Sequence, residues 1–234
     1  MDIVYLVKDC YLNDELTYSL RSLKNIPHDK VFIVGGFPTN LKRESLVHIP
    51  VLQGNNKYRN TTNNLKYICS NKAISEDFIL MNDDFFILRP VVPEELNLCR
   101  GYIDDVLCEY VRRYGEFYSQ YIREMKQAKI FLEDLGIKKP LSYELHIPMV
   151  INKQKFLDMF AIPHIDALGD NSQKRSIYGN LYCKNSKVIN DVKVFNDYFY
   201  PLGSDKFLST EDNSWSKTKQ YINSLFPEKS IYEI

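Results

Sequence analysis

Short apolar runs that alternate with helix-patterned segments constrain the fold of this chain more than any other feature. The runs are rich in Val, Ile, Leu and Phe, and they cover residues 2–7, 31–36, 47–52 and 77–81. They are too short and too uniformly apolar for amphipathic helices, so each is expected to be a buried strand. Between the first two, Asn13 or Asp14 can cap a helix that ends before Pro27. This alternation predicts an α/β domain with a mostly parallel sheet, whose ligand lies at the carboxyl ends of the strands.

The rest of the chain has a different pattern. A further helix is expected at about 62–73. Residues 102–135 lack proline, place apolar residues at helical spacing and are rich in Tyr, Arg, Glu and Lys, which predicts a helical insert at about 100–138. The last third is irregular. We therefore expect a single domain over residues 1–234, with flanking helices around the sheet and this insert.

Composition narrows the functional classes. The chain has 234 residues, 44% of them hydrophobic and 26% charged, which is typical of a packed globular protein. Lys plus Arg and Asp plus Glu are both 30, so a nucleic acid would have to be bound by a local basic patch. The five cysteines have no zinc-ligand or redox spacing and are expected to be reduced thiols. Without an apolar leader or an apolar run of membrane length, we expect a cytoplasmic protein.

The sharpest local signal is the motif Asn82, Asp83 and Asp84, which follows one strongly apolar segment and precedes another. Adjacent carboxylates repel one another unless a cation or strong hydrogen-bond donors compensate them. A hard divalent ion, Mg²⁺ or Mn²⁺, bound by the two Asp side chains, phosphate oxygens and water would do so. An Asp pair at a strand end is often only a solvated turn. The apolar segments on both sides favour the metal site.

Six segments of the chain together carry a family resemblance: residues 2–9, 15–23, 78–86, 145–148, 207–213 and 226–233. In their content and order, these segments resemble the Stealth family of sugar-phosphate transferases. Its members include bacterial capsule polymerases and the lysosomal-targeting N-acetylglucosamine-1-phosphotransferase. Cys10 stands where the family's first block has glycine, and the fourth block reads Glu-Asp-Asn in place of Asn-Asp-Asp.

The resemblance implies a glycosyltransferase A-type fold that binds a nucleotide-sugar through a metal-bound diphosphate. It places Asp9 and Arg21 near the nucleotide and Asp83 and Asp84 near the metal. The resemblance also implies catalytic or phosphate-binding roles for His146, Arg175, Glu211 and Asp212. To the expected donor-binding residues we add Asn63 and Asn82.

Each of these catalytic candidates also has a structural interpretation. Without the family's H-x-P pattern, His146 would more often be a packed or hydrogen-bonding core residue. With it, the side chain is a candidate base for an acceptor hydroxyl. Arg175 could clamp a diphosphate or lie in a solvated loop. Glu211 and Asp212 could be a base, metal ligands or only a helix cap.

Aromatic residues and a glycine pair give weaker signals. Trp215 and the aromatic run at residues 198–200 could stack on a sugar or base, although such aromatics usually belong to a core. The pair Gly35 and Gly36 lacks the dinucleotide-binding pattern and is interpreted as a turn.

Several activities remain open. A glycosyltransferase would release a nucleoside diphosphate, a Stealth-type sugar-1-phosphate transferase would release a nucleoside monophosphate, and a saccharide-binding module would not need the acidic pair and His146 together. We favour the glycosyltransferase. The acceptor is a saccharide or, alternatively, a hydroxymethylated base in phage DNA. The basic residues considered for DNA are Arg112, Arg113, Arg123, Lys126 and Lys129 in the insert, or Lys153, Lys155, Lys174 and Lys184.

Overall fold

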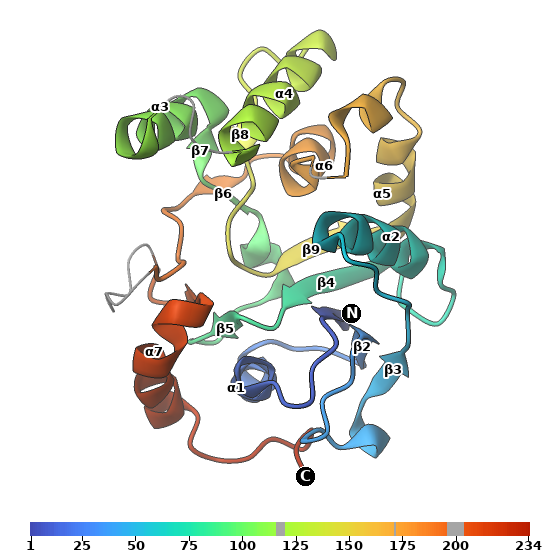
Figure 1. Ribbon diagram of the computed structural model, residues 1–234, viewed down its shortest axis with the longest axis vertical. Coiled ribbons are helices and arrows are strands. Elements are labelled where there is room, and N and C mark those ends of the chain that lie inside the picture. Colours follow the sequence, from blue (N-terminus) through green and yellow to red (C-terminus); the bar gives the residue numbers. More distant parts are fainter. Residues whose placement is uncertain (116–119, 171, 196–203) are drawn as a thin grey trace. The chain divides into compact units, whose positions relative to one another are not determined.

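The computed structural model describes residues 1–115, 120–170, 172–195 and 204–234. The chain divides into two compact units (Figure 1). Unit 1 consists of Met1–Leu96, His146–Lys153 and Asn190–Ile234. Unit 2 consists of Asn97–Leu145 and Gln154–Ile189.

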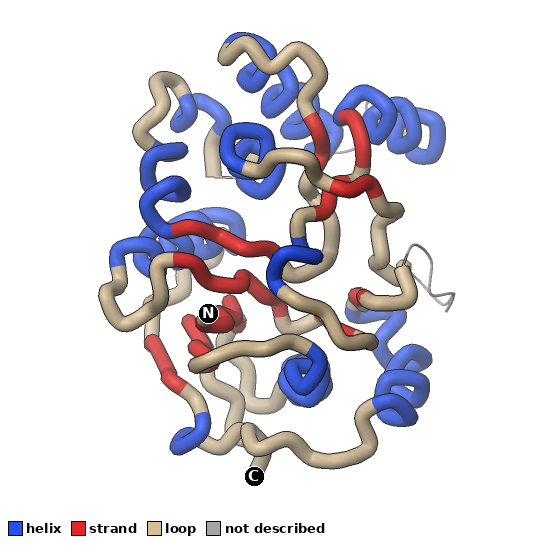
Figure 2. The backbone as a smooth tube through the Cα atoms, turned by 180° about the vertical axis from the view of Figure 1, so that it is seen from behind, coloured by secondary structure: helices blue, strands red, loops and turns tan. Residues whose placement is uncertain are grey.

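Unit 1 contains a five-stranded sheet, which Figure 2 shows in red from behind. Its strands, in spatial order, are β3 (Val47–Ile49), β2 (Val31–Gly35), β1 (Asp2–Val7), β4 (Asp77–Asn82) and β9 (Met149–Asn152). β9 runs antiparallel to β4, and the other neighbours are parallel. The central strands β1, β2 and β4 are buried along most of their length, as their uniformly apolar sequences predict. The expected α/β class with a mostly parallel sheet is confirmed.

Two helices connect the parallel strands. α1 (Asp14–Ser22) leads from β1 to β2, and α2 (Lys57–Ser70) leads from β3 to β4. These crossovers run in opposite directions along the sheet, so right-handed connections place the two helices on opposite faces (Figure 1). Asn13 caps α1 as expected, by accepting a hydrogen bond from the backbone nitrogen of Leu16 at 2.9 Å. α2 begins before the expected residue 62 because Asn56 caps its first turn.

A smaller layer packs against α1. β5 (Phe85–Ile87) pairs antiparallel with β11 (Phe207–Ser209), and α7 (Asp212–Leu225) follows. The apolar residues of this layer form a core of Tyr18, Phe86, Leu88, Val194, Leu208, Ile222 and Phe226. Trp215 stacks on Phe86 with ring centroids 5.9 Å apart, so it belongs to this core.

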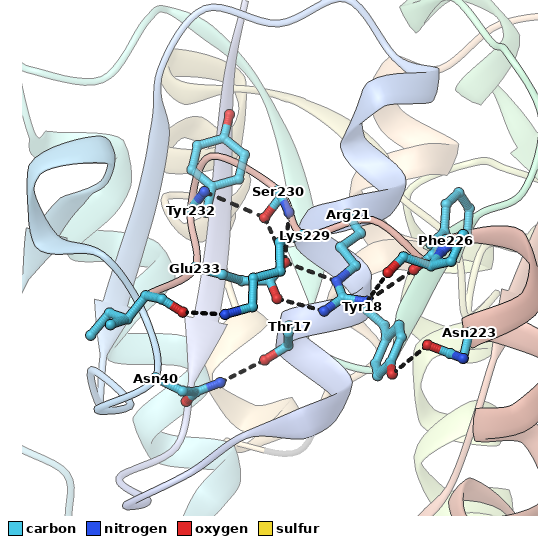
Figure 3. Close-up of polar contacts among 12 residues, drawn as sticks. Thr17, Tyr18, Arg21, Asn40, Asn223, Phe226, Lys229, Ser230, Tyr232 and Glu233 are labelled. Carbon is cyan, nitrogen blue, oxygen red and sulfur yellow. Dashed lines mark hydrogen bonds and ion pairs between the residues drawn. The ribbon is translucent and has the colours of Figure 1, made fainter.

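The C-terminal segment is tied to α1 by the guanidinium of Arg21 (Figure 3). Arg21 donates from Nε and Nη2 to the two carboxylate oxygens of Glu233, at 2.8 and 2.6 Å. Its Nη1 donates to the backbone oxygen of Phe226 at 2.9 Å, and its guanidinium lies over the Tyr18 ring. All three nitrogens of this side chain are therefore used to hold the C-terminal segment.

Unit 2 contains most of the expected helical insert and extends beyond it. α3 (Ile103–Tyr114) and α4 (Gln120–Asp134) lie within the expected range, and the unit also includes residues 154–189. The remaining helices and strands are α5 (Lys153–Phe160), whose first residue belongs to unit 1, α6 (Lys174–Tyr182), β6 (Leu98–Cys99), β7 (Gly101–Tyr102), β8 (Leu141–Ser142) and β10 (Lys187–Val188). β6 pairs with β10, and β7 pairs with β8.

Short 3-10 helices complete the secondary structure: η1 (Leu23–Asn25), η2 (Arg43–Ser45), η3 (Pro93–Leu96) and η4 (Ile165–Leu168). In the described part of the chain, no helix is both long enough and apolar enough to cross a membrane. All five cysteines are free thiols, as expected.

Candidate active site

The sheet of unit 1 has a topological switch point between β1 and β4. From β1 the chain continues to β2 and β3 on one side, and it then returns to β4 on the other side of β1. Open parallel sheets bind their ligands outside the carboxyl ends of the strands at such a point. Leu6 pairs with Asn82 at the end of the β1–β4 register, so Asn82 lies at this edge. Asp83 and Asp84 follow directly and turn the chain into β5.

Gly35 and Gly36 let the neighbouring loop lie directly against the end of β1. A Cβ atom on Gly35 would be 2.3 Å from the carbonyl oxygen of Val7, and one on Gly36 would be 2.5 Å from that of Lys8. Gly35 also has a φ of 105°, which side chains rarely allow. Interpreting the pair as a plain turn was incomplete, because Gly35 ends β2 and the pair fixes the backbone that leads to Asp9.

Both carboxylates of the acidic pair have protein partners. Asn13 donates from Nδ2 to Oδ2 of Asp83 at 2.7 Å. Oδ2 of Asp84 accepts two hydrogen bonds, from Ser209 Oγ at 2.9 Å and from Lys193 Nζ at 3.1 Å. Hydrogen-bond donors and one ammonium therefore compensate part of the negative charge of the two carboxylates. From the sequence, a metal ion was expected to compensate this charge.

Glu15 extends the acidic pair into a larger carboxyl cluster. Its Oε1 accepts a hydrogen bond from Thr210 Oγ1 at 2.5 Å. Burial, followed by the negative charges of Asp84, Asp83 and Asp212, raises the pKa of Glu15 to about 7, although the Thr210 hydrogen bond opposes the change. Burial also raises the pKa of Asp83. Carboxyl groups with raised pKa values of this kind are common at functional sites. Sequence analysis gave Glu15 no functional role.

An extended segment that starts at Asp191 supplies two polar side chains to this region. Along this segment, burial alternates. Val192 and Val194 are buried, whereas Asp191 and Lys193 are half-buried. Ser209 in β11 holds the segment, because it donates its backbone N–H to Val192 and accepts from the N–H of Val194. Side chains alternate along an extended chain, so Asp191 and Lys193 point to the face opposite the valines.

Asp191 holds the imidazole of His146. The Nδ1 atom of His146 lies 2.9 Å from Oδ2 and 3.0 Å from Oδ1 of this carboxylate. A carboxylate can only accept, so the proton belongs on Nδ1 and Nε2 is left as a proton acceptor. The ring also packs edge-on against Phe85, the residue after Asp84, and its side chain is 31% exposed. The carboxylate thus fixes the ring orientation and leaves Nε2 as the nitrogen that can accept a proton.

Two expected donor-binding residues lie on exposed surfaces of unit 1. Asp9 is exposed just after β1, and its backbone nitrogen lies 3.4 Å from Oε1 of Gln53. Asn63 is exposed on α2. Asp9 is thus at the carboxyl edge of the sheet, where a ligand can reach it.

Arg21 was expected near the nucleotide. The structure places its guanidinium against Glu233, in the last turn of α1, whereas the Asn13 cap that contacts Asp83 is at the other end of that helix. The described contacts give Arg21 a role in holding the C-terminal segment.

Glu211 and Asp212 start α7. Glu211 is the N-cap residue, and it forms a reciprocal capping box with Ser214. The structural interpretation is therefore correct for Glu211, whose carboxylate caps the helix. Asp212 is exposed in the first turn and contributes to the charge around Glu15. The aromatic run at residues 198–200 lies outside the described residues.

Arg175 belongs to unit 2, where it is half-buried in the first turn of α6. It is therefore on a helix and not in the solvated loop that its polar neighbours suggested.

The basic residues considered for DNA have different environments. Lys129 forms ion pairs with Asp104 and Glu133. Lys153 and Lys174 are buried, and each donates to backbone carbonyl oxygens. These two ammonium groups of the second basic patch are therefore used within the fold and do not point to an exposed surface.

The acidic pair could supply two protein ligands to a divalent ion, but not more. Among the residues that the structure describes, no group of three or more His, Cys, Asp and Glu side chains is placed to hold a metal. Mg²⁺ commonly has only one or two carboxylate ligands and completes its shell with phosphate and water. Asp83 and Asp84 have carboxylate oxygens of this hard type, and Oδ2 of Asp84 is paired with Lys193 Nζ at 3.1 Å. In their chemistry, these two carboxylates would suit Mg²⁺ or Mn²⁺.

Comparison with known proteins gives no identification. No protein-family model matches the chain, and no curated protein matches its sequence. Function therefore has to be inferred from the residues and contacts of unit 1.

Proposed function

We propose that the chain is a transferase that binds a nucleotide-sugar through Mg²⁺ or Mn²⁺ and moves the sugar to an acceptor hydroxyl. The observation that carries the proposal is that a carboxyl cluster at the switch point lies beside an oriented histidine. Phe85 lies between the acidic pair and the histidine, because it follows Asp84 in the chain and its ring packs against His146. The segment 191–193 also contacts both groups, since Asp191 binds His146 and Lys193 binds Asp84.

The roles follow from the chemistry of each group. Asp83 and Asp84 would hold the divalent ion, which offsets the negative charge that develops on the departing diphosphate. Nε2 of His146 takes the proton of the acceptor hydroxyl while Asp191 holds the ring. The acceptor oxygen forms a bond to the anomeric carbon, the bond from that carbon to the phosphate oxygen breaks, and a nucleoside diphosphate leaves. The resemblance to the Stealth family favours a saccharide as the acceptor.

Sugar-1-phosphate transfer is the second candidate, and one observation favours it. The carboxylate of Glu211 caps α7, so the better-oriented base is His146, which the Stealth resemblance connects with sugar-phosphate transfer. In that reaction the acceptor oxygen attacks the β-phosphorus, the bond between the two phosphates breaks, and a nucleoside monophosphate leaves. The same residues serve both reactions, so the leaving nucleotide distinguishes them.

The test is a turnover screen that identifies the released nucleotide. Purified protein is incubated with UDP-, GDP-, ADP- and dTDP-sugars, a saccharide mixture, and either Mg²⁺ or Mn²⁺, with EDTA as the control. A nucleoside diphosphate supports glycosyl transfer, and a monophosphate that forms only with acceptor supports sugar-phosphate transfer. Equal turnover in EDTA, or no turnover of any donor, would contradict the proposal.

A further inference from the structure

Lys193 is the cation that the described structure places directly on the acidic pair. Its Nζ lies 3.1 Å from Oδ2 of Asp84, and the two side chains are 17% and 16% exposed. Ser209 donates to the same carboxylate oxygen at 2.9 Å. Asp84 therefore keeps a hydrogen bond from Ser209 even if the ammonium moves away.

The backbone of Lys193 is fixed, and its side chain is long enough to reach more than one acceptor. Val192 and Val194 are 1% and 4% exposed, and both are bonded to Ser209 through the backbone. The lysine side chain has four methylene groups and an ammonium with three donors, so it can exchange one acceptor for another within a short radius. The fold thus places an ammonium on Asp84, within reach of a diphosphate bound there.

The charge around Lys193 changes when a divalent ion arrives. An ion on Asp84 would repel the ammonium, and Ser209 can still satisfy part of the carboxylate. A metal-bound diphosphate brings several anionic oxygens, which are strong acceptors for a lysine ammonium. The ammonium therefore has a better partner in the ternary complex than in the empty site.

On the basis of the proposed function, we propose that Lys193 is the second cation of the donor site: it leaves Asp84 when the divalent ion binds and donates to the diphosphate. In the free protein it shields the carboxylates, and in the complex it stabilises the departing phosphate. Lys193 thus competes with the metal ion alone but cooperates with the metal–diphosphate complex.

This role predicts changes of opposite sign in one variant, measured with Mn²⁺ and inorganic pyrophosphate as probes. In Lys193→Met, Mn²⁺ alone should bind about 3-fold or more tightly, because its competitor is gone. Pyrophosphate in saturating Mn²⁺ should bind about 10-fold or more weakly, because a charged hydrogen bond is lost. Electron paramagnetic resonance measures free Mn²⁺, and calorimetry measures pyrophosphate binding.

Controls separate this role from a structural one. Lys193→Arg keeps the charge and should restore most of the pyrophosphate affinity. Lys206→Met removes an ammonium that is paired with Glu95 and should change neither affinity. Weaker binding of both probes by Lys193→Met, with a lowered melting temperature, would mean that Lys193 is structural. Unchanged pyrophosphate affinity would also overturn the inference while leaving the proposed function standing. If the wild type bound no Mn²⁺–pyrophosphate, the proposed function would fail as well.

Discussion

The carboxylate of Asp191 lies 2.9 Å from Nδ1 of His146 through one oxygen and 3.0 Å through the other. The histidine comes just before β9, and the aspartate comes from the segment beside β11. The pair therefore exists only in the folded protein, where it fixes the ring with Nε2 as the proton acceptor.

His146→Ala should lower kcat by about 10²- to 10⁴-fold with little change in the donor KM, the usual loss for a general base. Asp191→Asn should lower kcat by about 10- to 100-fold, because the ring loses its orienting carboxylate. Comparing kcat with the donor KM gives the distinguishing readout. A raised donor KM with unchanged kcat would instead show that His146 only positions the diphosphate.

Glu15→Gln should change how stability depends on pH. The pKa of Glu15 is about 7 in the folded protein, above the value of about 4.3 for a free glutamate. The folded state therefore holds this proton more tightly, and wild-type stability decreases as pH rises from about 4.5 to about 7. The variant lacks this decrease, so it should be about 1 to 2 kcal/mol more stable than wild type at about pH 8 and similar at about pH 4.5.

Urea midpoints at the two pH values measure this difference. Glu94→Gln, at an exposed position in η3, is the matched control. A gain of equal size at both pH values would contradict the raised pKa of Glu15. Mg²⁺ at about pH 8 should restore part of the wild-type stability, because a cation stabilises the ionised cluster.

Gly36→Ala should lower stability and distort the backbone at the end of β1. Its Cβ would lie 2.5 Å from the carbonyl oxygen of Lys8 and 2.7 Å from Cα of Asp9, and backbone atoms cannot move aside without displacing β1. We expect a loss of about 1 to 3 kcal/mol in unfolding free energy, together with weaker donor binding. Gly54→Ala is the control, since its Cβ would be 3.7 Å from the nearest atom, on Asn60. Equal effects of the two substitutions would argue against the close approach.

Arg21→Met should lower stability by about 1 to 3 kcal/mol at neutral pH, because the half-buried carboxylate of Glu233 loses its charged partner and keeps only the hydrogen bonds from Ser230. Burial acts to raise the pKa of Glu233, but hydrogen bonds from Arg21 and Ser230 outweigh it, so the pKa is lowered. The stabilisation is then present above about pH 4.5 and lost as pH falls below it, so the deficit should shrink at about pH 3. Urea unfolding at both pH values checks this. An unchanged donor KM would confirm that Arg21 does not bind the nucleotide, and a large increase would contradict the clamp as its main role.

The pattern of the sequence predicted the three central strands of unit 1 well, because buried parallel strands are continuous apolar runs. β1 has the expected bounds, and β2 and β4 differ from expectation by one residue at an end. The edge strands were predicted less well, because β3 ends at Ile49 and not at residue 52, and β9 was not predicted. The start of α2 was missed because its first turns are polar, with KYRNTTNN before the first leucine. A cap at Asn56 was the available signal.

Tertiary contacts explain what was missed at the site. Lys193 and Asp84 are 109 residues apart in the chain, and neither motif spacing nor local pattern connects them. The alternation of polar and apolar residues from Asp191 to Val194 would have indicated an extended segment with one buried face. It would not have indicated which carboxylate or histidine faces the polar side. In contrast, Asp83 and Asp84 were found because a charged pair between two apolar strands is a local signal.

The most direct test of the metal–diphosphate site is calorimetric binding of UDP and GDP with and without Mn²⁺, to wild type and to Asp84→Asn. We expect Mn²⁺-dependent binding of at least one nucleotide by the wild type. Asp84→Asn should weaken that binding by about 10-fold or more, because it removes an anionic metal ligand, while its melting temperature stays close to that of wild type. Binding that does not depend on Mn²⁺, or a variant that keeps the wild-type Mn²⁺-dependent affinity, would contradict the site.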